Sequence, residues 1–133
     1  MGVRIMVNRR AFLMGFLSSP FFFFLKPSIS WANIPSVRLE AKRAGTGGQT
    51  EIVVHVAHKG NSLIHHVDRV ALFADGQEIK QWKYSWSDLP PSENFSVAYV
   101  VNLKKEATFS ALANCNVHGE NSDLGDLKVS AAS

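Results

Sequence analysis

Cysteine and methionine are scarce in this sequence in ways that exclude several kinds of protein. Cys115 is the only cysteine among 133 residues, so no disulfide can form within the chain. No methionine follows Met14, which argues against a blue-copper site, because such sites combine two histidines and a cysteine with a weak axial methionine. No stretch of residues 33–133 has a convincing helical period, so we expect a β protein, and the role of its one thiol has to be explained.

The first 32 residues have the layout of an export signal. They contain four basic residues and no acid, and the apolar run over residues 11–25 is too short for a comfortable membrane span. Ser-Trp-Ala at residues 30–32 places small residues at the −3 and −1 positions of a cleavage site after Ala32. The pair Arg9-Arg10, followed by Ala-Phe-Leu, resembles a twin-arginine signal; an ordinary secretory signal and an uncleaved anchor are the alternatives.

Removing this segment changes the electrostatic character of the chain. Residues 33–133 carry ten basic and eleven acidic side chains, whereas the whole chain has a net charge of +3 with neutral histidines. The basic excess belongs to the signal, so nucleic acid is not an expected partner. We therefore expect residues 1–32 to engage the export machinery and residues 33–133 to form one small domain in the periplasm.

The mature region has the pattern of short antiparallel strands. Residues 50–58 are β-branched and alternate, with Ile52, Val54 and Val56 on one face. Residues 65–86 predict a hairpin around Asp75-Gly76, because such turns need positive backbone φ angles. Further strands are expected at residues 36–41, 95–103, 107–115 and 126–130.

This pattern predicts an all-β, immunoglobulin-like antiparallel β-sandwich of about seven strands. We expect the aromatic side chains to pack in the core and hairpins rather than to form a binding surface. These residues are Trp82, Trp86, Phe95, Tyr99 and Phe109.

The histidines and the cysteine carry the strongest chemical signal. Four of the five histidines fall within residues 55–66, and the fifth, His118, lies three residues after Cys115. Imidazoles with one thiolate form a donor set that suits iron, copper or zinc. The loop of residues 58–65 could return one histidine to another, and the segment after residue 115 could meet them at one end of the sandwich. The competing interpretation is a buried cysteine that only packs in the core, together with a cluster of histidines on the surface that binds no metal.

Other chemistries have weaker support. No local signature of a hydrolase or cysteine protease is present. The glycine-rich stretch of residues 44–49 lacks the lysine and the strand-to-helix setting of a phosphate loop, so it is interpreted as a turn.

The stretch Cys-Asn-Val-His-Gly at residues 115–119 resembles the signature of the superoxide reductases, the desulfoferrodoxin and neelaredoxin group. Residues 65–79 also resemble a segment in which that family has a ligand histidine, a strand and an Asp-Gly turn. The resemblance covers roughly residues 50–130. It implies a β-sandwich with a mononuclear non-haem iron, bound by equatorial histidines and one axial thiolate, that reduces superoxide to hydrogen peroxide.

Carried over by position, the resemblance implies four metal ligands: His58, His65, Cys115 and His118. Six residues separate the first two, one more than is usual in the family. It also implies that the axial thiolate donates electron density to the iron.

One family ligand has no counterpart, because the N-terminal Glu-Lys-His stretch is missing and no histidine precedes His55. His66 is the first candidate to replace this missing ligand, and His55 and water are alternatives. A site with only three imidazoles is a further possibility. Lys59, beside His58, is a candidate substitute for the family's substrate-attracting lysine. The chain also lacks a four-cysteine rubredoxin-like module, so a single metal centre is expected.

Two functional classes stay open at this point. The first is an exported, superoxide reductase-like oxidoreductase with superoxide as substrate and an unidentified electron donor. The second is a non-catalytic periplasmic metal-binding or electron-transfer module of the same fold, and the missing histidine motivates it. A sandwich adaptor that binds a protein partner through an edge strand is a further alternative, and a homo-oligomer is compatible with any of them.

Overall fold

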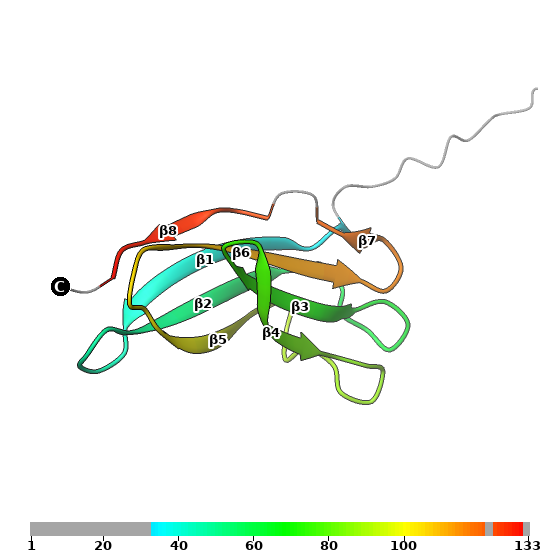
Figure 1. Ribbon diagram of the computed structural model, residues 1–133. Coiled ribbons are helices and arrows are strands. Elements are labelled where there is room, and N and C mark those ends of the chain that lie inside the picture. Colours follow the sequence, from blue (N-terminus) through cyan, green and yellow to red (C-terminus); the bar gives the residue numbers. More distant parts are fainter. Residues whose placement is uncertain (1–32, 122–123, 132–133) are drawn as a thin grey trace, which may run out of the picture.

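The computed structural model describes residues 33–121 and 124–131, and the predicted signal at residues 1–32 lies outside them. Within the described residues the chain forms two antiparallel sheets that pack face to face (Figure 1). One sheet has the order β1-β2-β5, and the other has the order β4-β3-β6-β7, with β8 also paired to β6. The strands are β1 Ser36–Arg43, β2 Gln49–Ala57, β3 Val67–Ala74, β4 Gln77–Lys83, β5 Asn94–Asn102, β6 Ala107–Cys115, β7 Gly119–Glu120 and β8 Leu127–Val129.

The predicted antiparallel β-sandwich is confirmed. The β3–β4 hairpin turns at Asp75 and Gly76, whose φ angles are 49° and 81°, as the Asp-Gly pair predicts. The additional strand beyond the predicted seven is β7, which contains only two residues. No helix in the two described ranges is long and apolar enough to span a membrane.

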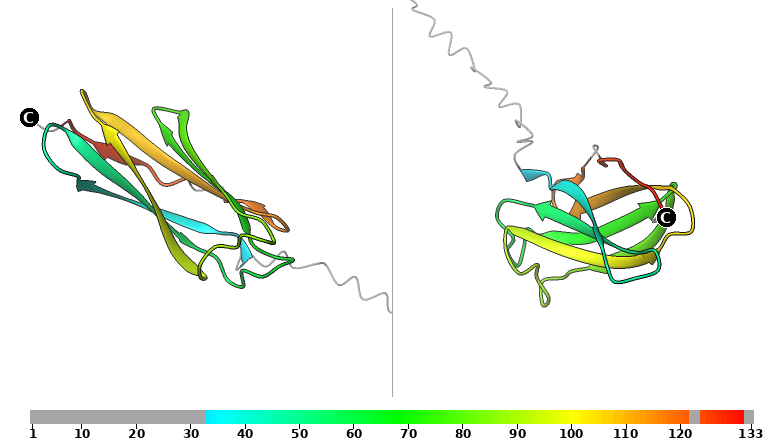
Figure 2. Two further views of the ribbon diagram at one scale, coloured as in Figure 1. Left: turned by 90° about the horizontal axis from the view of Figure 1, so that it is seen from below. Right: turned by 90° about the vertical axis from the view of Figure 1, so that its left-hand side faces the viewer.

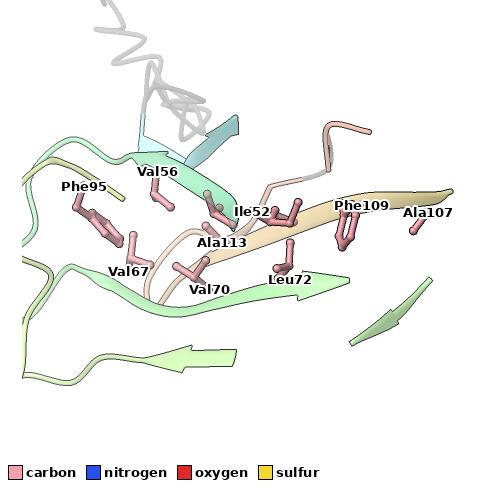
Figure 3. Packing of buried hydrophobic residues seen from close by; sticks show 11 residues of the cluster. Ile52, Val56, Val67, Val70, Leu72, Phe95, Ala107, Phe109 and Ala113 are labelled. Atoms are coloured by element: carbon pink, nitrogen blue, oxygen red, sulfur yellow. The ribbon is translucent and has the colours of Figure 1, made fainter. Parts of the chain in front are cut away.

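The core lies between the two sheets and is made by alternation along the strands. Ile52, Val54 and Val56 on β2 point inward and are almost fully buried, as predicted. The opposite sheet contributes Val70 and Leu72 from β3, and Figure 3 shows these side chains facing those of β2 across the interior. Burial of such side chains contributes roughly 1.5–3 kcal/mol each to folding.

One aromatic residue departs from the expectation. Phe95 and Phe109 are buried, and Trp82 and Tyr99 are partly buried and pack against the core. Trp86, however, is 69% exposed, so the prediction that it packs inside is wrong. It lies after the end of β4 in the turn closed by Ser85 and Asp88, where strand alternation no longer directs side chains inward.

Strand β6 carries the inward alternation to the end of the sandwich. Ala107, Phe109, Ala111, Ala113 and Cys115 are all buried, and the residues between them are less so. The thiol is therefore the last member of the inward-facing row of this strand.

A β-bulge occurs beside that thiol. Val67 is paired with Cys115, but Arg69 is paired with Asn114, so Asp68 is an extra residue on β3. Bulges of this kind bend the strand and change the direction of nearby side chains. The bulge separates the histidine-containing loop from the regular part of the sheet.

Candidate metal centre

The candidate centre lies at the end of the sandwich where β2 ends, β3 begins and β6 ends. Figures 1 and 2 show the loop before β3 and the β6–β7 turn side by side at this end, near the start of β1. Metal-ligating side chains from segments far apart in the sequence therefore meet here.

Three predicted ligands form a compact group. Ligand atoms of His58, His65 and Cys115 all lie within 4.8 Å of one another. The rings of His58 and His65 have centroids 4.7 Å apart, so the loop between them returns the second ring to the first. Gly60, with a φ of 83°, allows the loop to turn tightly.

His118 joins this group through its Nδ1 atom. This nitrogen lies 3.0 Å from His65 Nε2 and 3.6 Å from Cys115 Sγ. The backbone N–H of His118 also donates to the same sulfur at 3.5 Å. Gly119 follows with a φ of 84°, and the turn from β6 into β7 brings the ring back over the thiol. The structure thus places all four predicted ligands together.

The side chain of Asn61 joins the His58 ring to the backbone at the start of β3. Asn61 Oδ1 lies 2.7 Å from His58 Nδ1 and also accepts the backbone N–H of Val67 at 3.0 Å. Because this oxygen accepts, the contact is satisfied by the tautomer with the proton on His58 Nδ1, and Nε2 of the same ring lies 3.2 Å from the carbonyl oxygen of Asn33. Such outer partners set the tautomer and orientation of metal-binding imidazoles. Sequence analysis did not identify Asn61, since a loop asparagine has no distinctive pattern.

Burial and neighbouring rings lower the pKa of His65. Partial desolvation is the largest cause, and Coulomb interactions with His58 and His118 act in the same direction. A hydrogen bond to the backbone of Gly60 opposes them. The lowered pKa favours the neutral, ligating form of the imidazole.

Asn116 explains the second position of the Cys-Asn-x-His-Gly stretch. Its Oδ1 accepts the backbone N–H of His66 at 2.9 Å, and its Nδ2 donates to the carbonyl of Ile64 at 3.1 Å. Its backbone N–H also donates to the carbonyl of His66 at 3.0 Å. One side chain therefore fastens the histidine-containing loop to the turn that carries Cys115 and His118.

The two further histidines occupy different surroundings. The His66 ring is buried, and its Nδ1 donates to the carbonyl of Ser62 at 3.0 Å. It lies next to His65 but is not a member of the compact group. His55 points to the outer face of β2, where Nε2 contacts Glu40 at 2.8 Å and Nδ1 contacts Ser96 at 2.7 Å. The structure does not bring His55 to the centre.

Lys59 is exposed on the loop beside His58. It lines a shallow hollow together with Ile34, His58 and Glu93. A cationic side chain therefore stands at the surface next to one of the grouped histidines.

The donor set and its spacing fit a first-row transition metal. Nitrogen and sulfur donors at about 2.0–2.3 Å from one ion lie roughly 3.0–3.6 Å from their neighbours, depending on the coordination geometry. The separations of His118 Nδ1 from His65 Nε2 and from Cys115 Sγ, 3.0 and 3.6 Å, fall in this range. Three imidazoles and a thiolate suit iron, zinc or copper rather than calcium or magnesium. The residues present therefore fit a single first-row transition-metal ion, for which iron is one candidate.

An antiparallel β-sandwich with a histidine-cysteine cluster at one end is the class of protein that the fold and the site define. The family model for desulfoferrodoxin matches residues 31–121, and the chain belongs to this family. No curated protein matches the chain.

Several solved structures share the fold. A proposed superoxide reductase of Thermotoga maritima is 21% identical, with a TM-score of 0.54 over 79% of this chain and 90% of that one. A superoxide reductase of Nanoarchaeum equitans is 16% identical, with a TM-score of 0.53 over 74% and 93% of the two chains. The reduced neelaredoxin of Archaeoglobus fulgidus is 16% identical, with a TM-score of 0.51 over 77% and 93%. At these identities the likeness establishes the fold alone.

Proposed function

We propose that this protein is a superoxide reductase-like oxidoreductase that uses a mononuclear non-haem iron bound by His58, His65, His118 and Cys115. One observation carries the proposal: a buried thiol and three imidazoles from separate segments converge at one end of the sandwich. Family membership supports the same chemistry.

When bound, the iron would supply one electron to superoxide, which takes up two protons to become hydrogen peroxide, and an external one-electron reductant would restore the ferrous state. Cys115, buried at the end of β6, would hold the iron through its thiolate and supply electron density to it. The backbone N–H of His118 donates to that sulfur, so it partly offsets the charge of the thiolate and holds the Cys115 side chain in its orientation. Asn61 keeps His58 in the tautomer whose Nε2 can ligate.

Lys59 would attract the anionic substrate. It stands on the exposed side of His58 and lines the hollow there, so its charge can raise the local concentration of a small anion. Glu93 lines the same hollow and moderates that field. Because Lys59 is exposed, salt screens its charge, so its contribution should depend on ionic strength.

We further propose that residues 1–32 direct the folded protein to the periplasm through the twin-arginine route and are removed after Ala32. Four basic residues, the Arg9-Arg10 pair and the short apolar run support this. A route that carries folded proteins would allow iron to be inserted before export.

The test is stopped-flow mixing of the anaerobically reduced, iron-loaded protein with superoxide. We expect the loaded protein to consume superoxide much faster than the iron-free protein and to form hydrogen peroxide without oxygen. His65→Ala should lose this reaction, whereas His55→Ala, which changes a histidine on the outer face of β2, should keep it.

Iron binding without faster superoxide consumption would instead support a metal-binding or electron-transfer module. The missing N-terminal histidine favours this second candidate, because it leaves the metal shell one imidazole short.

A further inference from the structure

Large apolar side chains gather on the outside of the end of the sandwich that carries the candidate centre. Of the five exposed large hydrophobic residues in the described part of the chain, four lie on the three loops at this end. The fifth, Val100, lies on β5 toward the opposite end. The four are between 58% and 83% exposed, and we call them the apolar rim: Leu63, Ile64, Trp86 and Val117.

The apolar rim adjoins the candidate ligands. Ile64 and Val117 each come immediately before a histidine of the grouped set. Asn116 Nδ2 donates to the carbonyl of Ile64 at 3.1 Å, so the two segments that present these apolar side chains are bonded to each other. The hydrogen bonds of Asn116 keep both segments in place, and the apolar surface is therefore preformed.

Trp86 belongs to the third loop, which follows β4. Asn61 Nδ2 donates to the carbonyl of Ser92 at 3.0 Å, and this bond joins the histidine-containing loop to the segment between Trp86 and β5. Figure 1 shows the loop after β4 at the same end as the loop before β3 and the β6–β7 turn. The apolar rim thus extends over three neighbouring loops outside the centre.

The size of the apolar rim indicates the kind of contact it can make. With these exposed fractions, the four side chains present roughly 400 Å² of apolar surface to water. A permanent homodimer buries about 1,000 Å² or more on each subunit, whereas electron-transfer complexes bury less than about 1,200 Å² in total. The apolar rim is therefore too small for a permanent dimer and matches a transient redox complex.

The charges beside the apolar rim do not favour a bilayer. The described residues of the three loops carry one lysine, Lys59, and two acids, Asp88 and Glu93. Attraction to an anionic membrane requires a cluster of basic side chains, which these loops do not contain. Apolar contact with another protein is the interaction that this surface fits.

We propose that the apolar rim is the docking surface for the protein that returns an electron to the iron. The partner is a small one-electron carrier whose redox centre lies under an apolar patch of its own surface. Contact at the apolar rim places this carrier against the loops that hold His65 and His118. The carrier loses one electron, the ferric centre becomes ferrous, and the complex separates before superoxide arrives. This inference rests on the proposed superoxide reductase-like function.

The test compares the unchanged protein with three variants. The rim variant combines Leu63→Asn, Ile64→Asn and Val117→Thr, which remove apolar surface without adding charge. Trp86→Ser removes the fourth side chain. Val100→Thr is the matched control, because it changes the exposed valine of β5 and leaves the apolar rim intact. Urea unfolding and iron content establish that each protein is folded and loaded.

Electron exchange of the ferrous proteins is followed by stopped flow. A ferric c-type cytochrome and an oxidised blue-copper protein are the protein probes, and ferricyanide is a small probe that needs no docking surface. We expect the rim variant to exchange with at least one protein probe at least about tenfold more slowly than the unchanged protein. Trp86→Ser should be slowed less, and Val100→Thr should match the unchanged protein. Ferricyanide and superoxide should react equally with all four proteins.

A second readout does not depend on iron. Amide chemical shifts of the iron-free protein are recorded during titration with the protein probe that exchanges fastest. They should change around residues 62–64 and 117 and stay constant around residue 100. The rim variant should show much smaller changes at the same probe concentration.

Equal exchange rates in the rim variant and the unchanged protein would overturn the docking surface and leave the proposed function intact. Exchange with neither protein probe, while ferricyanide still reacts, would do the same. Vesicle binding or self-association that disappears in the rim variant would assign the apolar rim to a lipid surface or a second copy and overturn the redox partner. Failure of the iron-loaded, unchanged protein to consume superoxide would instead overturn the proposed function.

Discussion

The sulfur of Cys115 lies 3.6 Å from Nδ1 of His118 and accepts the backbone N–H of the same residue at 3.5 Å. One residue thus contacts the thiol both through its ring and through its main chain. This double contact is possible because the turn from β6 into β7 is only three residues long between the paired positions Cys115 and Gly119. The cysteine and histidine of the motif are therefore positioned by each other.

Replacement of the thiol should separate the spectroscopic role of Cys115 from metal binding. Cys115→Ser should abolish the thiolate-to-ferric charge-transfer band of the oxidised protein, while the three imidazoles retain part of the iron. The measurement is an optical spectrum with iron content per chain. His55→Ala serves as the control for a ring outside the centre and should leave the band unchanged. A band that survives in Cys115→Ser would remove the cysteine from the metal shell.

Asn61 should matter for metal affinity although it binds no metal in this proposal. Its Oδ1 holds the His58 tautomer and also accepts the N–H of Val67. Loss of such an outer partner typically lowers metal affinity about 10–100-fold. Asn61→Ala should therefore weaken ferrous iron binding by about that factor in a chelator competition, and Asn61→Asp should recover part of it.

The matched control for that series is Asn102→Ala at the far end of β5, which should bind iron as the unchanged protein does. Unaltered affinity in Asn61→Ala would show that the orientation of His58 does not depend on this hydrogen bond.

Sequence patterns were sufficient for the fold, and the resemblance of residues 115–119 to a family signature supplied the four candidate ligands that the structure brings together. The inward-facing apolar residues of β2, the strict alternation of β6 and the Asp75-Gly76 turn determine two sheets and their inward faces, and Cys115 falls on the inward face by the same period of two. The gathering of the four candidate ligands follows from antiparallel strands that end at one edge.

Contacts within loops were not predictable in the same way. Nothing in the sequence indicates that Asn61 bonds to His58, or that the carbonyl of Asn33 lies beside the same ring, because both contacts join irregular segments without a period. Trp86 was misplaced for a related reason: the predicted hairpin extended to residue 86, whereas β4 ends at Lys83, so that Trp86 lies in the following turn.

A surface pair on the three-stranded sheet should make a small, pH-dependent contribution to stability. The hydrogen bond from His55 lowers the pKa of Glu40 below its ordinary value of 4.5, with Lys42 and Arg38 acting in the same direction. Since the folded state holds this carboxylate ionised more strongly than the unfolded state, the contribution is present above pH 4.5 and is lost as the pH falls through the folded pKa.

A double-mutant cycle with Glu40→Gln and His55→Ala, followed by urea unfolding at pH 6 and pH 3, measures this coupling. We expect a favourable coupling at the higher pH that disappears at the lower one. A coupling of equal size at both pH values would contradict the assigned cause of the pKa shift.

Gly119 should be required for its backbone conformation rather than for its small size. Its φ is 84°, yet a Cβ added there would meet no heavy atom within 4 Å. An alanine in this left-handed region costs about 1–2 kcal/mol, so Gly119→Ala should lower the free energy of unfolding of the iron-free protein by about that amount. The same strain should weaken ferrous iron binding, because His118 immediately precedes Gly119 in the chain and its ring position depends on the conformation there. Gly119→Asn tests the reasoning, since asparagine tolerates this region and should lose less of both properties.

Urea unfolding and chelator competition on the three proteins provide the measurements. Equal losses for alanine and asparagine would point to side-chain crowding in place of backbone strain, which the open space around Gly119 argues against.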